Sequence, residues 1–128
     1  PTLQKTIIFS KDEELIRFIS SSINSESEII IYRSIDSPID AFALTIVEHP
    51  ALLIIDDDLI KPNTVSFLKN IKSIGKQNFI ILITSNESLD FGREVSSLGV
   101  LHYSIKPCNC VILNEFITSI IKYTINIK

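Results

Sequence analysis

Five short apolar segments recur along the chain, and each is followed by a stretch with helical periodicity. The apolar segments occupy residues 6–9, 29–32, 52–55, 79–83 and 100–105. Their apolar residues are consecutive rather than alternating with polar ones, which is typical of strands buried on both faces of a parallel sheet. The helical stretches occupy residues 12–23, 38–48, 63–74, 88–98 and 110–125, and Gly75 suits the C-terminal cap of the third.

This alternation of strands and helices predicts an α/β fold, because the crossovers between parallel strands place helices on both faces of the sheet. The sequence contains no glycine-rich dinucleotide fingerprint and no Walker A motif, which argues against the nucleotide-binding versions of such folds. We therefore predict a single domain over residues 1–128. Its expected architecture is flavodoxin-like: a doubly wound, five-stranded parallel sheet of order 2-1-3-4-5 with helices on both faces.

Composition narrows the possible functions. The net charge of −3 and the absence of a run of Lys or Arg disfavour nucleic-acid binding within this domain. No apolar stretch approaches the roughly 20 residues of a membrane-spanning helix, and no signal-peptide pattern is present. We expect a cytoplasmic protein without a membrane segment. Cys108 and Cys110 have no second cysteine pair for a zinc site and are expected to be reduced thiols.

Polar residues follow the apolar segments at the points where the predicted strands end. Asp56 follows the third segment, Thr84 the fourth and Lys106 the fifth. In a sheet of this kind, sites form beyond the carboxyl ends of the strands. A carboxylate nucleophile, a cation for phosphoryl oxygens and a hydroxyl donor are the groups needed to transfer a phosphoryl group to an Asp side chain. Asp56, Lys106 and Thr84 are the candidates for these three roles.

The same segments resemble the receiver domains of two-component response regulators, the CheY-like family, over essentially the whole chain. The similar segments are LLIID at 52–56, SFLKNIK at 66–72, ILIT at 81–84 and LGVLHYSIKP at 98–107. The resemblance implies that Asp56 is the phosphoacceptor, with Thr84, Tyr103 and Lys106 as phosphate-binding or switch residues. It also implies a cis bond before Pro107, a Mg²⁺ cofactor, and a histidine kinase or phosphotransfer protein as partner.

The segment after the first strand departs from the family pattern. Two adjacent acids normally bind Mg²⁺ there, whereas this chain has Ser10 and Lys11. In one alternative, Lys11 pairs directly with Asp56 and partly replaces the metal. In the other, Asp12 or Asp58 approaches Asp56 and preserves a weakened metal site, with Asp56 and Asp12 as ligands.

The loop after the third strand is a second departure. Pro62 lies six residues after Asp56 instead of the usual four. Asp57 and Asp58 open this loop in the sequence. Both are expected to be ordinary polar residues of the loop.

Two functions remain open at this point. The first is a receiver whose Asp56 accepts a phosphoryl group from a histidine kinase. The second is a pseudo-receiver, a binding module that signals without phosphorylation because Ser10 and Lys11 replace the acidic pair. A flavin-binding enzyme on a similar fold is disfavoured, since the acidic segment after the first strand would repel a phosphate group. We expect a signalling domain rather than an enzyme.

The last predicted helix is apolar around more than one face. Its apolar residues include Val111, Ile112, Leu113, Phe116, Ile117, Ile120, Ile121 and Tyr123. Such a helix often buries a second face against a partner. We predict a homodimer or docking surface made by the helix at 88–98, the strand at 100–105 and the helix at 110–125. The alternative is a broad stripe that faces only the core.

Overall fold

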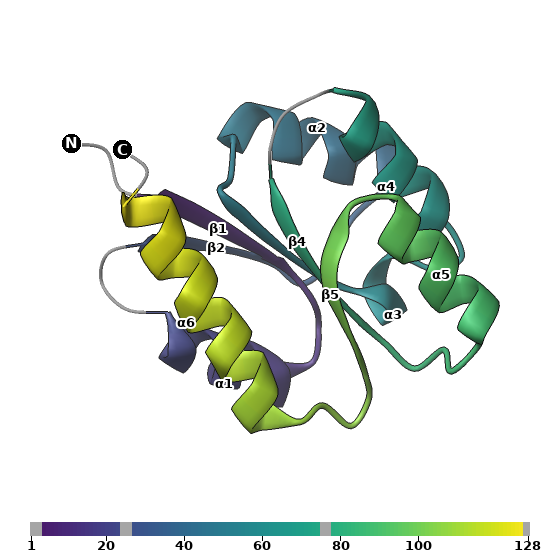
Figure 1. Cartoon of the computed structure of the whole chain (residues 1–128). Coiled ribbons are helices and arrows are strands. Elements are labelled where there is room, and N and C mark those ends of the chain that lie inside the picture. Colours follow the sequence, from purple (N-terminus) through teal and green to yellow (C-terminus); the bar gives the residue numbers. More distant parts are fainter. Residues whose placement is uncertain (1–3, 24–26, 75–77, 127–128) are drawn as a thin grey trace.

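A parallel five-stranded sheet forms the centre of the molecule (Figure 1). The computed structural model describes residues 4–23, 27–74 and 78–126. The strands are β1 (Gln4–Phe9), β2 (Ser27–Tyr32), β3 (Leu52–Asp56), β4 (Phe79–Thr84) and β5 (Val100–Ile105). Their order in the sheet is β2-β1-β3-β4-β5, and every neighbouring pair is parallel. The predicted fold class and strand order are confirmed.

Helices cover both faces of this sheet. They are α1 (Glu13–Ser22), α2 (Pro38–Glu48), α3 (Asp57–Ile60), α4 (Thr64–Ser73), α5 (Leu89–Ser97) and α6 (Cys110–Asn126). Figure 1 shows α1 and α6 on one side of the sheet and α2, α4 and α5 on the other. Gly75, the expected cap of the helix α4, lies outside the described residues.

The two helical layers enclose two separate apolar cores. One core joins Ile7, Leu53 and Leu82 to Phe67 of α4 and Val95 of α5. The other joins the opposite side chains of the strands to α1 and α6, with Ile8, Ile54, Ile81, Ile19 and Ile117 among its members. All five residues of β3 are buried, which explains why this segment reads as continuously apolar up to Asp56. The central strand is therefore a rigid support for the side chain at its end.

The short helix α3 is not predicted by the sequence, which indicates only a loop after Asp56. The Asp56 side chain accepts a hydrogen bond from the backbone N–H of Asp58 and so caps this single turn. Aspartate is a favoured N-cap because its carboxylate oxygen satisfies an otherwise unpaired N–H at a helix start. The strand end and the turn that follows it are thus fixed to each other by the same carboxylate.

The edge strand β5 contains an irregularity that places one extra residue in it. Ile80 pairs with Val100 and Ile81 pairs with His102, so Leu101 is unpaired in this register. Such a bulge changes which side chains face which side of the sheet. His102 stacks on Phe116 of α6, with ring centroids 4.0 Å apart, whereas Tyr103 packs against the core on the α5 side.

The apolar residues of helix α6 divide into a core-facing stripe and an exposed set that a partner could cover. Leu113, Ile117, Ile120 and Ile121 are buried against the sheet and α1, as a core-facing stripe requires. Val111, Ile112 and Tyr123 remain exposed, as do Leu101 and Ile105 on the adjacent edge strand. Among the described residues, no helix combines the length and hydrophobicity needed to cross a bilayer.

Candidate functional site

The carboxyl ends of β1, β3 and β5 bring three polar side chains together. Ser10 follows β1, Asp56 ends β3 and Lys106 follows β5. Asp56 is only 1% exposed, although it is a charged residue. A buried carboxylate needs hydrogen-bond donors or a cation, because its desolvation is otherwise costly. The groups around Asp56 supply both.

Each oxygen of the Asp56 carboxylate has a defined partner. The Ser10 hydroxyl donates to Oδ2 at 2.7 Å, and the backbone N–H of Asp58 donates to Oδ1 at 3.0 Å. The Lys106 ammonium lies 3.0 Å from both Oδ1 and Oδ2. Charge-assisted hydrogen bonds of this kind are stronger than neutral ones, so they hold the carboxylate in one orientation.

Lys106 is a cation shared by a group of carboxylates. Its Nζ lies 3.0 Å from Asp58 Oδ2 and 4.0 Å from Asp12 Oδ2, in addition to its contact with Asp56. Burial lowers the pKa of Lys106, but the hydrogen bonds and charges of Asp56 and Asp58 outweigh this effect and raise the pKa above its ordinary value. The ammonium therefore stays charged, and it occupies the centre of the acidic cluster.

Asp58 links this cluster to the surface. It accepts a hydrogen bond from Lys106 and forms an ion pair with Lys61 at 3.0 Å. The hydrogen bond from Lys106, and after it the one from Lys61, lowers the pKa of Asp58. Asp58 is therefore an ordered carboxylate in the site.

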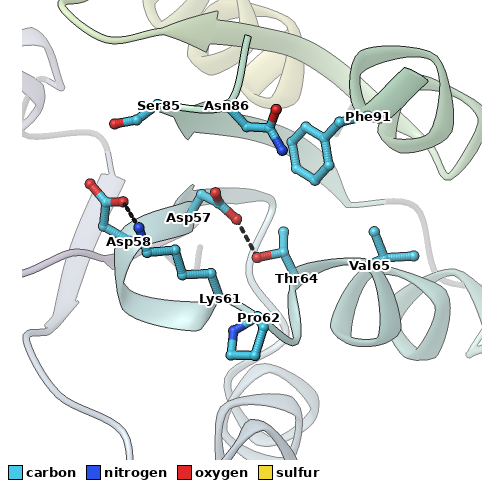
Figure 2. A pocket seen from close by; sticks show the side chains of 9 residues that line it. All are labelled: Asp57, Asp58, Lys61, Pro62, Thr64, Val65, Ser85, Asn86 and Phe91. Carbon is cyan, nitrogen blue, oxygen red and sulfur yellow. Dashed lines mark hydrogen bonds and ion pairs between the residues drawn. The ribbon is translucent and has the colours of Figure 1, made fainter. Parts of the chain in front are cut away.

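The Thr84 hydroxyl does not donate its hydrogen bond to Asp56. Its hydroxyl donates instead to Oδ2 of Asp57, at 2.8 Å. Asp57 is 6% exposed, so the sequence-based interpretation of this residue as part of an ordinary polar loop is wrong. Its other oxygen accepts a hydrogen bond from the Thr64 hydroxyl at the start of α4, as Figure 2 shows. Asp57 thus joins the ends of β3 and β4 to α4.

A hollow of about 460 Å³ opens beside this second carboxylate. Figure 2 shows Asp58, Lys61 and Pro62 along one side, with Ser85, Asn86 and Phe91 across from them. The hollow therefore separates the segment after β3 from the loop between β4 and α5. Asp57 lines the hollow on the side of the segment after β3. Its hydrogen bond with Thr84, the last residue of β4, links that segment to the end of β4.

Tyr103 packs against the glycine within α5. A β carbon at Gly92 would overlap the Tyr103 hydroxyl oxygen and would lie 2.7 Å from the ring carbon Cζ. Glycine inside a helix costs stability of about 1 kcal/mol relative to alanine, so it needs a packing reason. The Tyr103 ring provides this reason, and it occupies the space that glycine leaves.

The ion pair between Lys11 and Asp56 that one alternative anticipated is not formed. Lys11 is exposed, and the cation beside Asp56 is Lys106. The adjacent residue, Ser10, points inward and is 1% exposed. Successive side chains of an extended segment point in opposite directions, which explains why only one of the two can reach the site. The cis bond expected between Lys106 and Pro107 is present.

The side chains around Asp56 do not fit a Mg²⁺ ion as they stand. Mg²⁺ requires near-octahedral oxygen coordination, usually with one or two free carboxylates. Asp12 caps α1 through Oδ1, Asp58 is paired with two lysines, and the Lys106 ammonium lies between the carboxylates. Within residues 4–23, 27–74 and 78–126, no cluster of His, Cys, Asp and Glu side chains is arranged to hold a metal.

Sequence reasoning misses or undervalues four residues of this region. The sequence identifies Ser10 only as the replacement of an acid, and Asp57 only as a loop residue. It gives no role to Thr64 or Gly92. A glycine within a helical pattern is a signal for close packing, so Gly92 could have been found. Thr64 lies seven residues after Asp57, and no sequence pattern indicates that its hydroxyl reaches this carboxylate.

Comparisons with solved structures place this geometry in a known fold. The signal receiver domain of a DNA-binding response regulator from Colwellia psychrerythraea is 22% identical, with a TM-score of 0.77, over 93% of this chain and 98% of that one. The chemotaxis response regulator CheY4 of Vibrio cholerae is 17% identical, with a TM-score of 0.71, over 93% and 99%. A CheY-like receiver domain protein from Methanospirillum hungatei is 18% identical, with a TM-score of 0.74, over 99% and 100%.

These likenesses show that the chain has the CheY-like fold. They extend over nearly the full length of each compared domain. No protein-family model and no curated protein matches the sequence. Function must therefore be inferred from the side chains at the strand ends.

Proposed function

We propose that the chain is a receiver domain of two-component signal transduction, in which Asp56 accepts a phosphoryl group. The observation that carries this proposal is the contact between Asp56 and Lys106, an anionic nucleophile and a cation 3.0 Å apart at the ends of β3 and β5. Such a pair supplies the two groups that phosphoryl transfer to a carboxylate needs most. In this proposal residues 1–128 form the single receiver domain.

The transfer itself follows from the positions of these groups. An Asp56 oxygen attacks the phosphorus of a phosphohistidine on a kinase or phosphotransfer protein. The P–O bond forms as the P–N bond breaks, and the histidine nitrogen keeps the electron pair of the broken bond and takes a proton from solvent. Lys106 balances the charge on the phosphoryl oxygens, while Ser10 and the backbone N–H of Asp58 orient the carboxylate. In this proposal the domain acts as a signalling module.

The proposed output surface consists of α5, β5 and α6. Tyr103 belongs to β5 and packs on Gly92 of α5, so it joins two elements of this surface. Leu101 and Tyr123 are exposed on the outer side, at 50% and 55%. We expect this surface to bind a protein partner or a second copy of the chain, and the charge on Asp56 to change its affinity.

The proposal can be tested by NMR with a phosphoryl analogue. Amide spectra are recorded with and without beryllofluoride, and separately after treatment with acetyl phosphate. We expect shifts at Ser10, Asp56 and Lys106 that disappear in Asp56→Asn. Asp90→Asn is a matched control, because Asp90 is an exposed aspartate in the first turn of α5. Unchanged spectra in the wild-type protein would reject phosphoryl acceptance by Asp56.

A pseudo-receiver is the second candidate, and two observations favour it. Ser10 replaces an acid beside Asp56, and the Thr84 hydroxyl is already bonded to Asp57. In this case the Asp56–Lys106 pair is a permanent structural element, and α5, β5 and α6 bind a partner without phosphorylation. The two candidates differ in the analogue experiment, since a pseudo-receiver gives no shift at Asp56 but retains partner binding in Asp56→Asn.

A further inference from the structure

Asp57 is a buried carboxylate that lies outside the Asp56–Lys106 cluster. It is 6% exposed and accepts hydrogen bonds from the hydroxyls of Thr64 and Thr84. In the part of the chain that the structure describes, no lysine or arginine forms an ion pair with it. A buried carboxyl group in this environment depends on its hydroxyl donors, because burial without hydrogen-bond partners is costly.

The hydroxyl of Thr84 can donate one hydrogen bond, and Asp57 accepts that hydrogen bond. Thr84 is fully buried, so water does not compete for this hydrogen bond. The hydroxyl oxygen also accepts a hydrogen bond from the backbone N–H of Asn86 at 3.0 Å. A hydroxyl has a single O–H donor, and this one is already in use. A phosphoryl group on Asp56 could gain this hydrogen bond only if Asp57 lost it.

A chain of hydrogen bonds leads from Asp57 through Thr84 to the start of α5. The side-chain oxygen of Asn86 accepts a hydrogen bond from the backbone N–H of Ser88 at 2.9 Å. The Ser88 hydroxyl oxygen accepts in turn from the backbone N–H of Phe91 at 3.3 Å and caps α5. The next residue is Gly92, on which Tyr103 packs. The position of the Thr84 hydroxyl is thus connected to the place where the Tyr103 ring lies.

We infer that Asp57 is a positioning residue that holds the Thr84 hydroxyl away from Asp56 and thereby keeps α5 and Tyr103 in the arrangement seen here. Asp57 competes with a phosphoryl group on Asp56 for the same proton. The surface of α5, β5 and α6 then responds weakly to Asp56 while Asp57 accepts this hydrogen bond, and strongly when the Asp57 carboxylate is removed. The competition deepens the proposed function and rests on it, whereas the positioning of Tyr103 does not.

The first experiment uses no phosphoryl donor. The Tyr103 ring resonances are compared in Asp57→Ala, Thr84→Val and the double variant. We expect each single change to shift these resonances and the double variant to shift them no further, because both changes remove the same hydrogen bond. Thr84→Ser keeps the hydroxyl and should retain the wild-type spectrum. Additive shifts, or an unchanged Tyr103 in Thr84→Val, would overturn the inference.

A second measurement covers the case in which Asp57→Ala fails to fold. The side-chain carboxyl ¹³C resonance of Asp57 is followed in the wild-type protein, Thr84→Val and Thr84→Ser. Loss of the donated proton should move this resonance in Thr84→Val and leave it in place in Thr84→Ser. Thr45→Val serves as the matched control, because the buried Thr45 hydroxyl donates to the Ala41 carbonyl within α2. An Asp57 carboxyl resonance that does not move in Thr84→Val would contradict the proposed positioning role.

The third experiment tests the competition with beryllofluoride. In the wild-type protein we expect shifts at Asp56 and Lys106 and only small ones at Thr84 and Tyr103. In Asp57→Ala, which lacks the acceptor, the shifts at Thr84 and Tyr103 should be several-fold larger. Equal responses in the two proteins would overturn the competition. If Asp56 and Lys106 respond in neither protein, phosphoryl acceptance fails, and the two experiments without a donor still decide the role of Asp57.

Discussion

The Tyr103 hydroxyl lies where the β carbon of any larger residue at position 92 would be. This contact fixes the aromatic ring between β5 and α5, and it requires glycine in the middle of a helix. Gly92 is itself buried, so the contact lies inside the molecule. The pair therefore links the conformation of α5 to the rotamer of Tyr103.

Replacing Gly92 should have opposite effects in two backgrounds. In the wild-type protein, Gly92→Ala is expected to lower the free energy of unfolding or to displace the Tyr103 ring, because the added methyl group overlaps it. In a Tyr103→Ala background, the same change should stabilise the helix by about 1 kcal/mol, since alanine has the higher helix propensity. Urea unfolding of the four proteins measures both effects. The same sign in both backgrounds would show that the contact does not matter.

Removing the cation beside Asp56 should be more harmful than removing the carboxylate. Lys106→Met leaves Asp56 buried without its charge partner and should reduce the free energy of unfolding by about 3 kcal/mol. Asp56→Asn keeps a side chain that still hydrogen-bonds Ser10, so its cost should be smaller. The double variant should recover part of the loss. Chemical denaturation at neutral pH gives these values, and strictly additive losses would contradict the pairing.

Restoring the acids after β1 should create a metal response that the natural sequence lacks. Because Lys106 lies between the available carboxylates, millimolar Mg²⁺ should leave the melting temperature of the wild-type protein unchanged. Ser10→Asp with Lys11→Asp adds two carboxylates, and Mg²⁺ should then raise the melting temperature through binding to the folded state. Thermal unfolding with Mg²⁺ and with Na⁺ at equal ionic strength tests this. A Mg²⁺-dependent rise in the wild-type protein would disprove it.

The histidine on β5 should make the fold sensitive to mild acid. His102 stacks on Phe116 with its Nε2 buried and unpaired among the described residues, and burial lowers the pKa of His102 below its ordinary value of 6.5. The unfolded chain therefore binds a proton first as the pH falls, so stability is full above 6.5 and decreases below it. His102→Phe should reduce this decrease. Denaturant midpoints on either side of the ordinary pKa provide the comparison, and parallel curves for the two proteins would refute the prediction.

The exposed apolar residues of β5 and α6 should mediate self-association or partner binding. Leu101 and Tyr123 line a groove of about 310 Å³ together with Phe79 and Phe116. Leu101→Glu should reduce the average mass in concentrated solution, because it places a charge in this groove. Ile39→Glu is the matched control on α2, where Ile39 is 74% exposed. Sedimentation equilibrium gives the masses, and a monomeric wild-type protein at every concentration would exclude a homodimer.

The fold could be predicted because its strongest signals are local. Continuous apolar runs such as the one ending at Asp56 identify buried parallel strands, and the alternation with helices then leaves few topologies. The meeting of Asp56 with Lys106 follows from the same reasoning, since parallel strands end at a common edge. The helix α3 was missed because one turn of helix carries no periodicity, and only the capping by Asp56 reveals it.

The destination of the Thr84 hydroxyl could not be predicted. Two adjacent aspartates follow one another at the end of β3, and their side chains reach different partners. Which of them Thr84 reaches depends on the turn of α3 and on the distant hydroxyl of Thr64, neither of which the sequence indicates. The outward direction of Lys11 could have been inferred from the alternation of side chains once Ser10 is assigned to the interior.

The unpaired Leu101 has a consequence for how β5 meets other molecules. A smooth edge strand offers its free N–H and C=O groups as a template that any extended peptide can join. The bulge interrupts this template and turns an apolar side chain outward at the same point. Another chain that docks here has to match individual side chains, which favours selective recognition over indiscriminate extension of the sheet.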